Sequence, residues 1–135
     1  MIHCDNGVTF HETGHIQAIG PVDMGIKKGH TTVFTEAGKL IYVGDLENGG
    51  RDGYGKYYHH ATTGQLRYDG TWKNNQFHGV DNKEYHENGN LKYQGNFHMG
   101  LKHRAGKDFD IDGQFIRDVN HHFGKVCLSN PNQIL

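Results

Sequence analysis

The sequence contains few of the residues that build disulfide frameworks or proline-rich linkers. It has two prolines and two cysteines in 135 residues. Cys4 and Cys127 lie near opposite ends of the chain, where a linear fold would hold them too far apart for a disulfide. We therefore expect two free thiols, and the class of small disulfide-stabilised secreted domains is excluded.

Long hydrophobic runs and an excess of charge of one sign are also missing. No apolar run approaches the roughly 20 residues of a membrane span, and the segment Met1–Asn6 does not resemble a secretory signal. Fourteen Lys and Arg residues against fifteen Asp and Glu residues leave a net charge of -1. A chain with this charge has no global field that would attract nucleic acid. These features predict a cytoplasmic protein that does not bind nucleic acid.

Glycine and aromatic residues, by contrast, are abundant. The chain has 20 glycines, seven tyrosines, seven phenylalanines and one tryptophan, although only 34% of its residues are hydrophobic. Glycine supplies the positive φ angles of tight hairpin turns, and aromatic residues favour strands. The composition predicts an all-β protein made of many short strands.

A glycine followed two residues later by an aliphatic or aromatic residue recurs every 24 to 26 residues. A register held over five copies is the signature of a repeat architecture. We divide the single repeat domain 1–135 into an N-terminal cap strand (1–13), the units 14–37, 38–63, 64–88 and 89–112, a degenerate cap unit (113–126) and a tail (127–135).

The three central units share the pattern G-x-L-x-Y-x-G-x-(W/F/L), which alternates with the period of a β-strand. In the unit that begins at Gly64, this alternation places Tyr68 and Trp72 on a buried face. Arg67 and Lys73 are then expected on the solvent-facing side of the same strand. The glycine in the middle of each strand (Gly44, Gly70 and Gly95) should lie under an aromatic ring from the next unit.

These units resemble MORN repeats, which read Y-x-G-x-W followed by a glycine-rich return strand. The segment 68–72 matches this motif outright, and segments 42–46 and 93–97 match it with conservative changes. Residues 85–113 are more similar to the MORN-related repeats of bacterial antitoxin and immunity proteins. The resemblance implies tandem β-hairpins that form a short solenoid or an extended, twisted antiparallel sheet. It also implies a binding module, since such families include lipid-headgroup binders, scaffold modules and toxin-neutralising proteins.

We therefore expect a non-catalytic module that binds another protein, in the manner of an antitoxin, immunity protein or inhibitor. Aromatic and basic residues are favoured at such interfaces. The candidate binding residues are Tyr54, Tyr57, Tyr58, Arg67, Lys73, Phe77, Lys92 and Arg104. For Trp72, the strand alternation favours the core over a contact surface.

The alternative function is weak binding of phospholipids through their anionic headgroups, or a role as a membrane-associated scaffold. Its candidate residues are Lys73, Lys83, Lys92, Lys102, His103 and Arg104. Acidic residues are interleaved among these cations in the sequence, and a net charge near zero does not favour an anionic membrane surface.

A second alternative is a zinc-dependent hydrolase, because residues 11–15 read H-E-x-x-H. That chemistry requires a helix that stacks His11 and His15 on one face. Gly14 is the turn glycine of the repeat, so the segment is expected to form a turn. The chain has twelve histidines, but neighbours on a strand, such as His59 and His60, point to opposite faces and do not chelate one ion by themselves. We predict no catalytic residues, no metal site and no cofactor.

Overall fold

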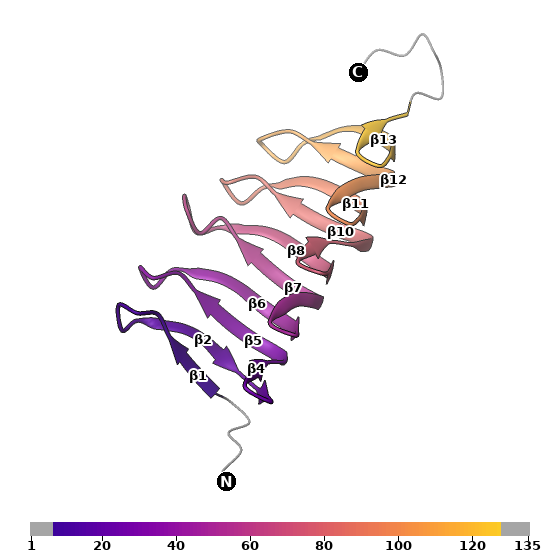
Figure 1. Cartoon of the computed structure of the whole chain (residues 1–135). Helices are drawn as coiled ribbons and strands as arrows, with labels where there is room; N and C mark the ends of the chain where they lie inside the picture. The colour runs from indigo at the N-terminus through magenta and orange to yellow at the C-terminus, as the bar shows by residue number, and fades with distance from the viewer. Residues whose placement is uncertain (1–6, 128–135) are drawn as a thin grey trace.

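A computed structural model describes residues 7–127 of the chain, and every element in this range is a β-strand. The strands follow one another as antiparallel hairpins along the axis of the molecule (Figure 1). They are β1 (Gly7–Phe10), β2 (Ile16–Gly20), β3 (Val22–Asp23), β4 (Ile26–Lys27), β5 (Gly29–Phe34), β6 (Leu40–Glu47), β7 (Gly50–Tyr58), β8 (Leu66–Lys73), β9 (Gln76–Phe77), β10 (Gly79–Tyr85), β11 (Leu91–His98), β12 (Leu101–Phe109), β13 (Phe115–His122) and β14 (Lys125–Val126).

Twelve of these strands form one sheet in the order β1-β2-β5-β6-β7-β8-β10-β11-β12-β13-β14, with β9 beside β8. The short strands β3 and β4 pair with each other. The sheet is open, because β1 and β14 at the two ends of this order do not pair with each other. The predicted all-β stack of tandem hairpins is confirmed. Cys4 lies outside the described residues, and Cys127 is a free, exposed thiol.

Two kinds of turn alternate along the stack. One kind has two residues with positive φ, as in the tight hairpin turns whose twist matches that of the strands. These pairs are Met24–Gly25, Asn48–Gly49, Asn74–Asn75, Met99–Gly100 and Phe123–Gly124. The other kind ends at the repeat glycine. At Gly38, for example, φ is 83° and the N–H donates to the carbonyl of Thr35 over 2.9 Å.

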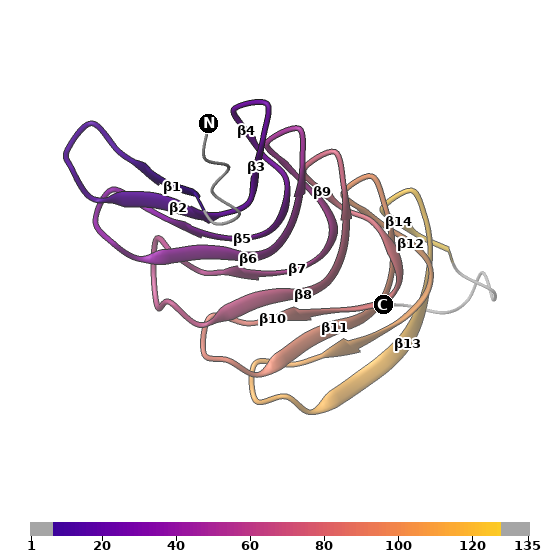
Figure 2. The ribbon, with the colours of Figure 1, turned by 90° about the horizontal axis from the view of Figure 1, so that it is seen from below.

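The strands bend sharply toward the face that carries the aromatic residues of the repeat pattern. Residues four apart on a flat strand lie about 13 Å apart along its axis. The rings of Tyr68 and Trp72 are nevertheless only 5.1 Å apart, and those of Tyr93 and Phe97 are 5.5 Å apart. The aromatic face is therefore the concave face. All hairpins curve in the same sense, and together they form a trough (Figure 2). We call this surface the trough and the opposite surface the outer face.

The core lies inside the bend. Its buried members are Tyr42, Leu46, Tyr68, Trp72, Tyr93, Phe97 and Val119. Rings of successive units contact each other edge to face, with centroids 5.6 Å apart for Tyr42 and Trp72 and 5.7 Å apart for Tyr68 and Phe97. Trp72 is 4% exposed, so it is a core residue, as the strand alternation predicted. Each unit is thus stabilised mainly by contacts with the next.

Other groups do approach the glycines of the aromatic face closely. These groups, however, are not the aromatic rings of the next unit that the sequence predicted. The hydroxyl of Tyr42 donates to the carbonyl of Asp45 in its own strand, 2.8 Å away, and Tyr68 makes the same bond to Thr71 over 2.7 Å. The backbone of Gly55 and the Tyr42 hydroxyl cover Gly44. Gly95 lies under the ring of Tyr93, whereas the side chain of Asn82 covers Gly70. The expectation of a ring from the next unit was therefore wrong, because the bend brings each tyrosine over its own strand.

The H-E-x-x-H segment forms a hairpin turn. The backbone N–H of His11 donates to the carbonyl of His15 over 2.8 Å, and Gly14 N–H donates to His11 O over 2.9 Å. Both imidazoles reach the neighbouring unit: His11 Nε2 lies 2.9 Å from the carbonyl of Phe34, and His15 Nδ1 contacts the carbonyl of Glu36. These histidines join two repeats.

Candidate binding site

A β-bulge determines where Arg67 points. Tyr57 pairs with Tyr68 and Tyr58 pairs with Leu66, so Arg67 is the extra residue that has no partner across the strands. A bulge re-aims the side chain it carries. The guanidinium carbon Cζ of Arg67 lies 5.4 Å from the ring centroid of Tyr57 and 5.9 Å from that of Phe77. Both rings pack against the core. The placement of Arg67 on the solvent side of the strand was therefore wrong, because the pattern of alternation does not reveal the bulge.

A second arginine, Arg51 on β7, also faces the ring of Tyr57. Arg51 is the second residue of β7, which begins directly after the Asn48–Gly49 turn. Its Cζ is 4.9 Å from the ring centroid of Tyr57 and 4.7 Å from that of Trp72. Both distances are within the range of cation–π contacts. Tyr57 is thus within cation–π distance of two guanidinium groups.

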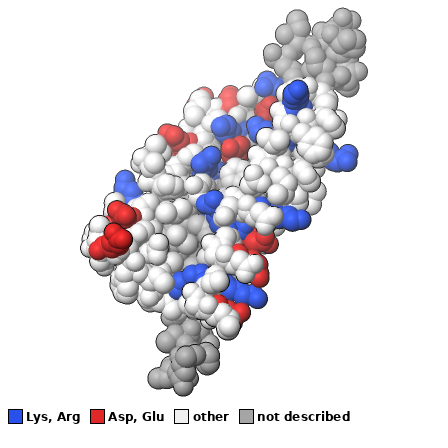
Figure 3. Space-filling model, in the orientation of Figure 1, with Lys and Arg blue, Asp and Glu red and all other residues white. Residues whose placement is uncertain are grey.

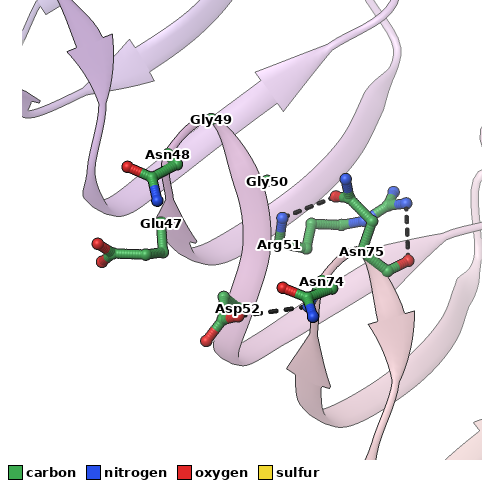
Figure 4. A pocket seen from close by; sticks show the side chains of 8 residues that line it. All are labelled: Glu47, Asn48, Gly49, Gly50, Arg51, Asp52, Asn74 and Asn75. Carbon is green, nitrogen blue, oxygen red and sulfur yellow. Dashed lines mark hydrogen bonds between the residues drawn. The ribbon is translucent and has the colours of Figure 1, made fainter. Parts of the chain in front are cut away.

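Amides hold Arg51 in this position. Its backbone N–H donates to Oδ1 of Asn75 over 2.8 Å, and its Nη2 donates to the carbonyl of Asn75 over 3.3 Å. Figure 4 shows Arg51 reaching toward Asn75, while Glu47 extends away from it on the other side of the strand. The carboxylate of Asp52 accepts from the backbone N–H of Asn74 over 3.3 Å.

The two arginines border an open hollow in the trough. This hollow has a volume of about 250 Å³ and is lined by Arg51, Tyr57, Arg67, Trp72, Asn75, Gln76, Phe77 and Gly100. Its floor is aromatic, with Tyr68 and Phe77 stacked beneath it at 2° between planes. We call this hollow and its lining the arginine site. A few convergent polar groups on an aromatic floor are typical of a binding site.

The arginine site has no internal counter-charge. The ion pairs of the described residues are Lys28–Glu47, Lys107–Asp118 and Arg117–Asp108, and none of them involves Arg51 or Arg67. Burial raises the pKa of the Tyr42 and Tyr68 hydroxyls, so the phenols beside the site are neutral hydrogen-bond donors. Two positive charges and aromatic rings are thus the chemistry that the site offers.

The structure brings three of the predicted binding residues together, namely Tyr57, Arg67 and Phe77. Tyr54 is on the outer face, where its hydroxyl bonds to the carboxylate of Asp69. Tyr58 follows Tyr57 on the strand and pairs with Leu66. Lys73 ends β8 opposite Gln76.

Lys92 and Arg104 lie one unit further along. Lys92 is exposed and occupies the bulge position equivalent to that of Arg67, since Glu84 pairs with Tyr93 and Tyr85 with Leu91. Arg104 is exposed and has a positive φ of 63°.

The residues considered for lipid binding do not share one surface. Lys83 lies on the outer face, between Asp69 and Gln94 of the adjoining strands. The Nζ atom of Lys102 is on the trough side, 4.3 Å from the ring centroid of Tyr93. Figure 3 shows Lys and Arg side chains scattered over one view of the molecule, with Asp and Glu among them.

Sequence reasoning missed Arg51, Asn75 and Gln76. The available signal was the alignment of the return strands. The second residue after the two-residue turn is Arg51 in this unit, and the equivalent residues of the neighbouring units are Lys27, Phe77 and Lys102. Arg51 is therefore part of a row of large side chains along the trough.

Histidines occupy the ends of the hairpins, where they link neighbouring units. His59 Nε2 contacts the carbonyl of Tyr85 at 3.0 Å, and His86 Nε2 contacts that of Phe109 at 3.2 Å. Between residues 7 and 127, no group of three His, Cys, Asp or Glu side chains is arranged to hold a metal ion. The same range contains no helix that could cross a membrane.

Comparison with known protein families finds repeats in the central part of the chain. Residues 42–59, 68–80 and 93–107 match the family model described as MORN repeat. Residues 81–99 match the model described as MORN repeat variant. No curated protein matches the chain. The matched segments include Tyr57, Phe77 and Arg51 of the arginine site.

Proposed function

Since this chain contains MORN repeats, we propose that it is a non-catalytic binding module that holds one partner protein in its trough. The observation that carries the proposal is the arginine site. Two guanidinium groups and the rings of Tyr57 and Phe77 face an open hollow, and arginine and aromatic side chains dominate the energetics of protein interfaces. Sequestration of a single partner, as by an antitoxin, immunity protein or inhibitor, is the form of this function that we propose.

The length of the trough supports a protein ligand. Strands lie about 4.8 Å apart, so the ten steps between β1 and β14 extend about 48 Å. A surface of this length can provide the roughly 800 Å² per partner of a standard protein interface. A bilayer is flat, whereas the arginine site is inside a concave surface.

The test is retention of a partner from a lysate of the source organism on the immobilised protein. We expect one protein to be retained by the wild type and by the outer-face variant Lys83→Gln, and to be lost by Tyr57→Ala, which removes a ring of the trough. Circular dichroism should show that both variants are folded. Loss of the partner by Lys83→Gln and not by Tyr57→Ala would contradict the proposal.

Liposome co-sedimentation addresses the alternative function. We expect no more protein to sediment with vesicles that contain anionic lipid than with neutral vesicles at 150 mM salt. Sedimentation that depends on anionic lipid and is abolished at higher salt would favour headgroup binding instead.

A further inference from the structure

We propose that the arginine site binds the carboxylates of an acidic, extended segment of the partner, with acidic residues three positions apart. This inference rests on the proposed function and names the chemistry of the partner at the same site. It follows from the two unpaired guanidiniums, from the size of the hollow and from the repeat distance along the trough.

The first step concerns charge. Arg51 and Arg67 both face the ring of Tyr57, and no described carboxylate lies within 4.0 Å of either one. By comparison, Arg117, further along the sheet, is paired with Asp108 across the strands at 3.1 Å. The Nε atom of Arg51 is buried without a hydrogen-bond partner among the described residues. Two like charges beside one ring repel each other, and a bound carboxylate would relieve that repulsion.

The second step concerns geometry and size. Guanidinium groups bind carboxylates through two parallel hydrogen bonds, which makes arginine more selective than lysine for planar anions. The side-chain amides of Asn75 and Gln76 also line the hollow and can donate to the same oxygens. A volume of about 250 Å³ accepts one acidic side chain and is smaller than most small-molecule pockets.

The third step concerns spacing. Equivalent positions of adjacent units are two strands apart, or about 9.6 Å. Arg67 on β8 and Lys92 on β11 are related in this way, because each is the extra residue of the same bulge. A polyproline II segment rises about 3.1 Å per residue with three residues per turn, so every third side chain is on one side at intervals of about 9.3 Å. Acidic residues at i and i+3 would therefore match the spacing of Arg67 and Lys92.

The fourth step selects a protein segment over a membrane. The two arginines of the site lie against the rings of the trough, with Arg51 over Trp72 and Arg67 over Tyr57. A flat surface of phosphates cannot enter this concave face, whereas a single extended chain can. Binding of anionic vesicles at the arginine site would therefore overturn the choice of a protein segment.

The experiment uses three synthetic peptides and the fluorescence of Trp72, which is the only tryptophan and lies 4.7 Å from Arg51 Cζ. The first peptide repeats Glu-Pro-Pro three times, the second replaces each Glu by Gln, and the third has the same composition as the first with its glutamates adjacent. At 20 mM salt we expect a saturable change of fluorescence with the first peptide. The dissociation constant should be at least ten times weaker for the third, and the second should not bind.

Arg67→Gln and Arg51→Gln should each weaken binding of the first peptide at least tenfold. Lys83→Gln, which removes a cation from the outer face, should leave it unchanged. Equal binding of the Glu and Gln peptides would overturn the carboxylate assignment, and equal binding of the first and third peptides would overturn the spacing. A Trp72 response to anionic vesicles, in place of the peptide, would assign the site to lipid.

Partner retention by variants distinguishes a failure of the carboxylate site from a failure of the proposed function. If the double variant Arg51→Gln, Arg67→Gln retains the natural partner while Tyr57→Ala loses it, the trough binds a protein but the carboxylate site is wrong. If neither variant affects partner retention and Lys83→Gln does, the proposed function itself fails.

Discussion

The phenol of Tyr42 lies over Gly55 of the neighbouring strand so closely that a Cβ atom on Gly55 would be 2.2 Å from the hydroxyl oxygen. The same relationship recurs between Tyr93 and Gly106, where the distance would be 2.0 Å. Side chains cannot approach that closely, so the tyrosine, the glycine and the bend of the hairpin depend on one another.

Gly55→Ala should therefore destabilise the protein strongly. The methyl group would displace the buried ring of Tyr42, and overpacking of this kind costs typically about 1 to 3 kcal/mol. Urea unfolding followed by circular dichroism measures the loss. The matched control is Gly50→Ala on the same strand, where the nearest atom is the flexible end of Asn75 at 3.1 Å and a smaller loss is expected. Equal effects of the two variants would mean that the Tyr42–Gly55 contact does not restrain the bend.

Trp72 should be the residue whose truncation is least tolerated. It contacts four other rings, and its Nε1 donates to the carbonyl of Gly55 over 3.1 Å. Trp72→Ala should cost about 3 to 5 kcal/mol, a large share of the 5 to 15 expected for a domain. Trp72→Phe keeps a ring but loses the hydrogen bond, so its loss should be smaller. Thermal unfolding monitored by circular dichroism compares the two variants, and similar melting temperatures would contradict this ranking.

Arg104 has a backbone conformation that glycine adopts in other units. Its φ is 63°, and the equivalent positions hold Gly29, Gly53 and Gly79 with φ between 91° and 126°. Left-handed backbone costs a residue with a side chain about 1 to 2 kcal/mol, whereas glycine adopts it freely. Arg104→Gly should leave stability unchanged or raise it by up to about 1 kcal/mol. Arg104→Val should lower it, as a denaturation midpoint in urea would show. A clear loss of stability in Arg104→Gly would mean that the arginine side chain itself stabilises β12.

The protein should lose stability in mild acid because of the surroundings of two histidines, His78 and His103. Nδ1 of His78 accepts from Met99 N–H, and Nδ1 of His103 accepts from Phe123 N–H, both over 3.1 Å. Burial lowers the pKa of His78 below its usual 6.5, helped by the nearby charges of His98 and Lys73. Burial and the charges of Arg104, His122 and His98 lower the pKa of His103 in the same direction.

A histidine whose pKa is lowered on folding binds fewer protons in the folded state than in the unfolded state. Its contribution to stability is present above the unfolded pKa of about 6.5 and is lost as the pH falls through and below that value. The denaturation midpoint should therefore be lower at pH 5 than at pH 7.5. The equivalent residue in the preceding unit is Asp52, which accepts from Asn74 N–H over 3.3 Å. His78→Asp with His103→Asp should keep both bonds and reduce this pH dependence, whereas His30→Gln, on an exposed part of β5, should not. An unchanged pH dependence in the double variant would assign the effect to other groups.

The sequence by itself determined the architecture of this protein. The glycine register, the turn residues and the alternation of Tyr68, Gly70 and Trp72 are local signals, and each fixes a turn or a strand face within one hairpin. They predicted the tandem hairpins, the core role of Trp72 and the turn at Gly14, because strand geometry and turn chemistry depend on residues close together in the chain.

Only the tertiary structure decided which side chains meet. The bulge at Arg67 depends on its pairing with β7, and the bend that brings Tyr68 and Trp72 together depends on the whole hairpin. Arg51 and Arg67 converge on Tyr57 because successive strands of the sheet lie side by side, although these residues are separated in the chain. Contacts between strands and units depend on register and curvature, and the periodicity of one strand does not specify either of them.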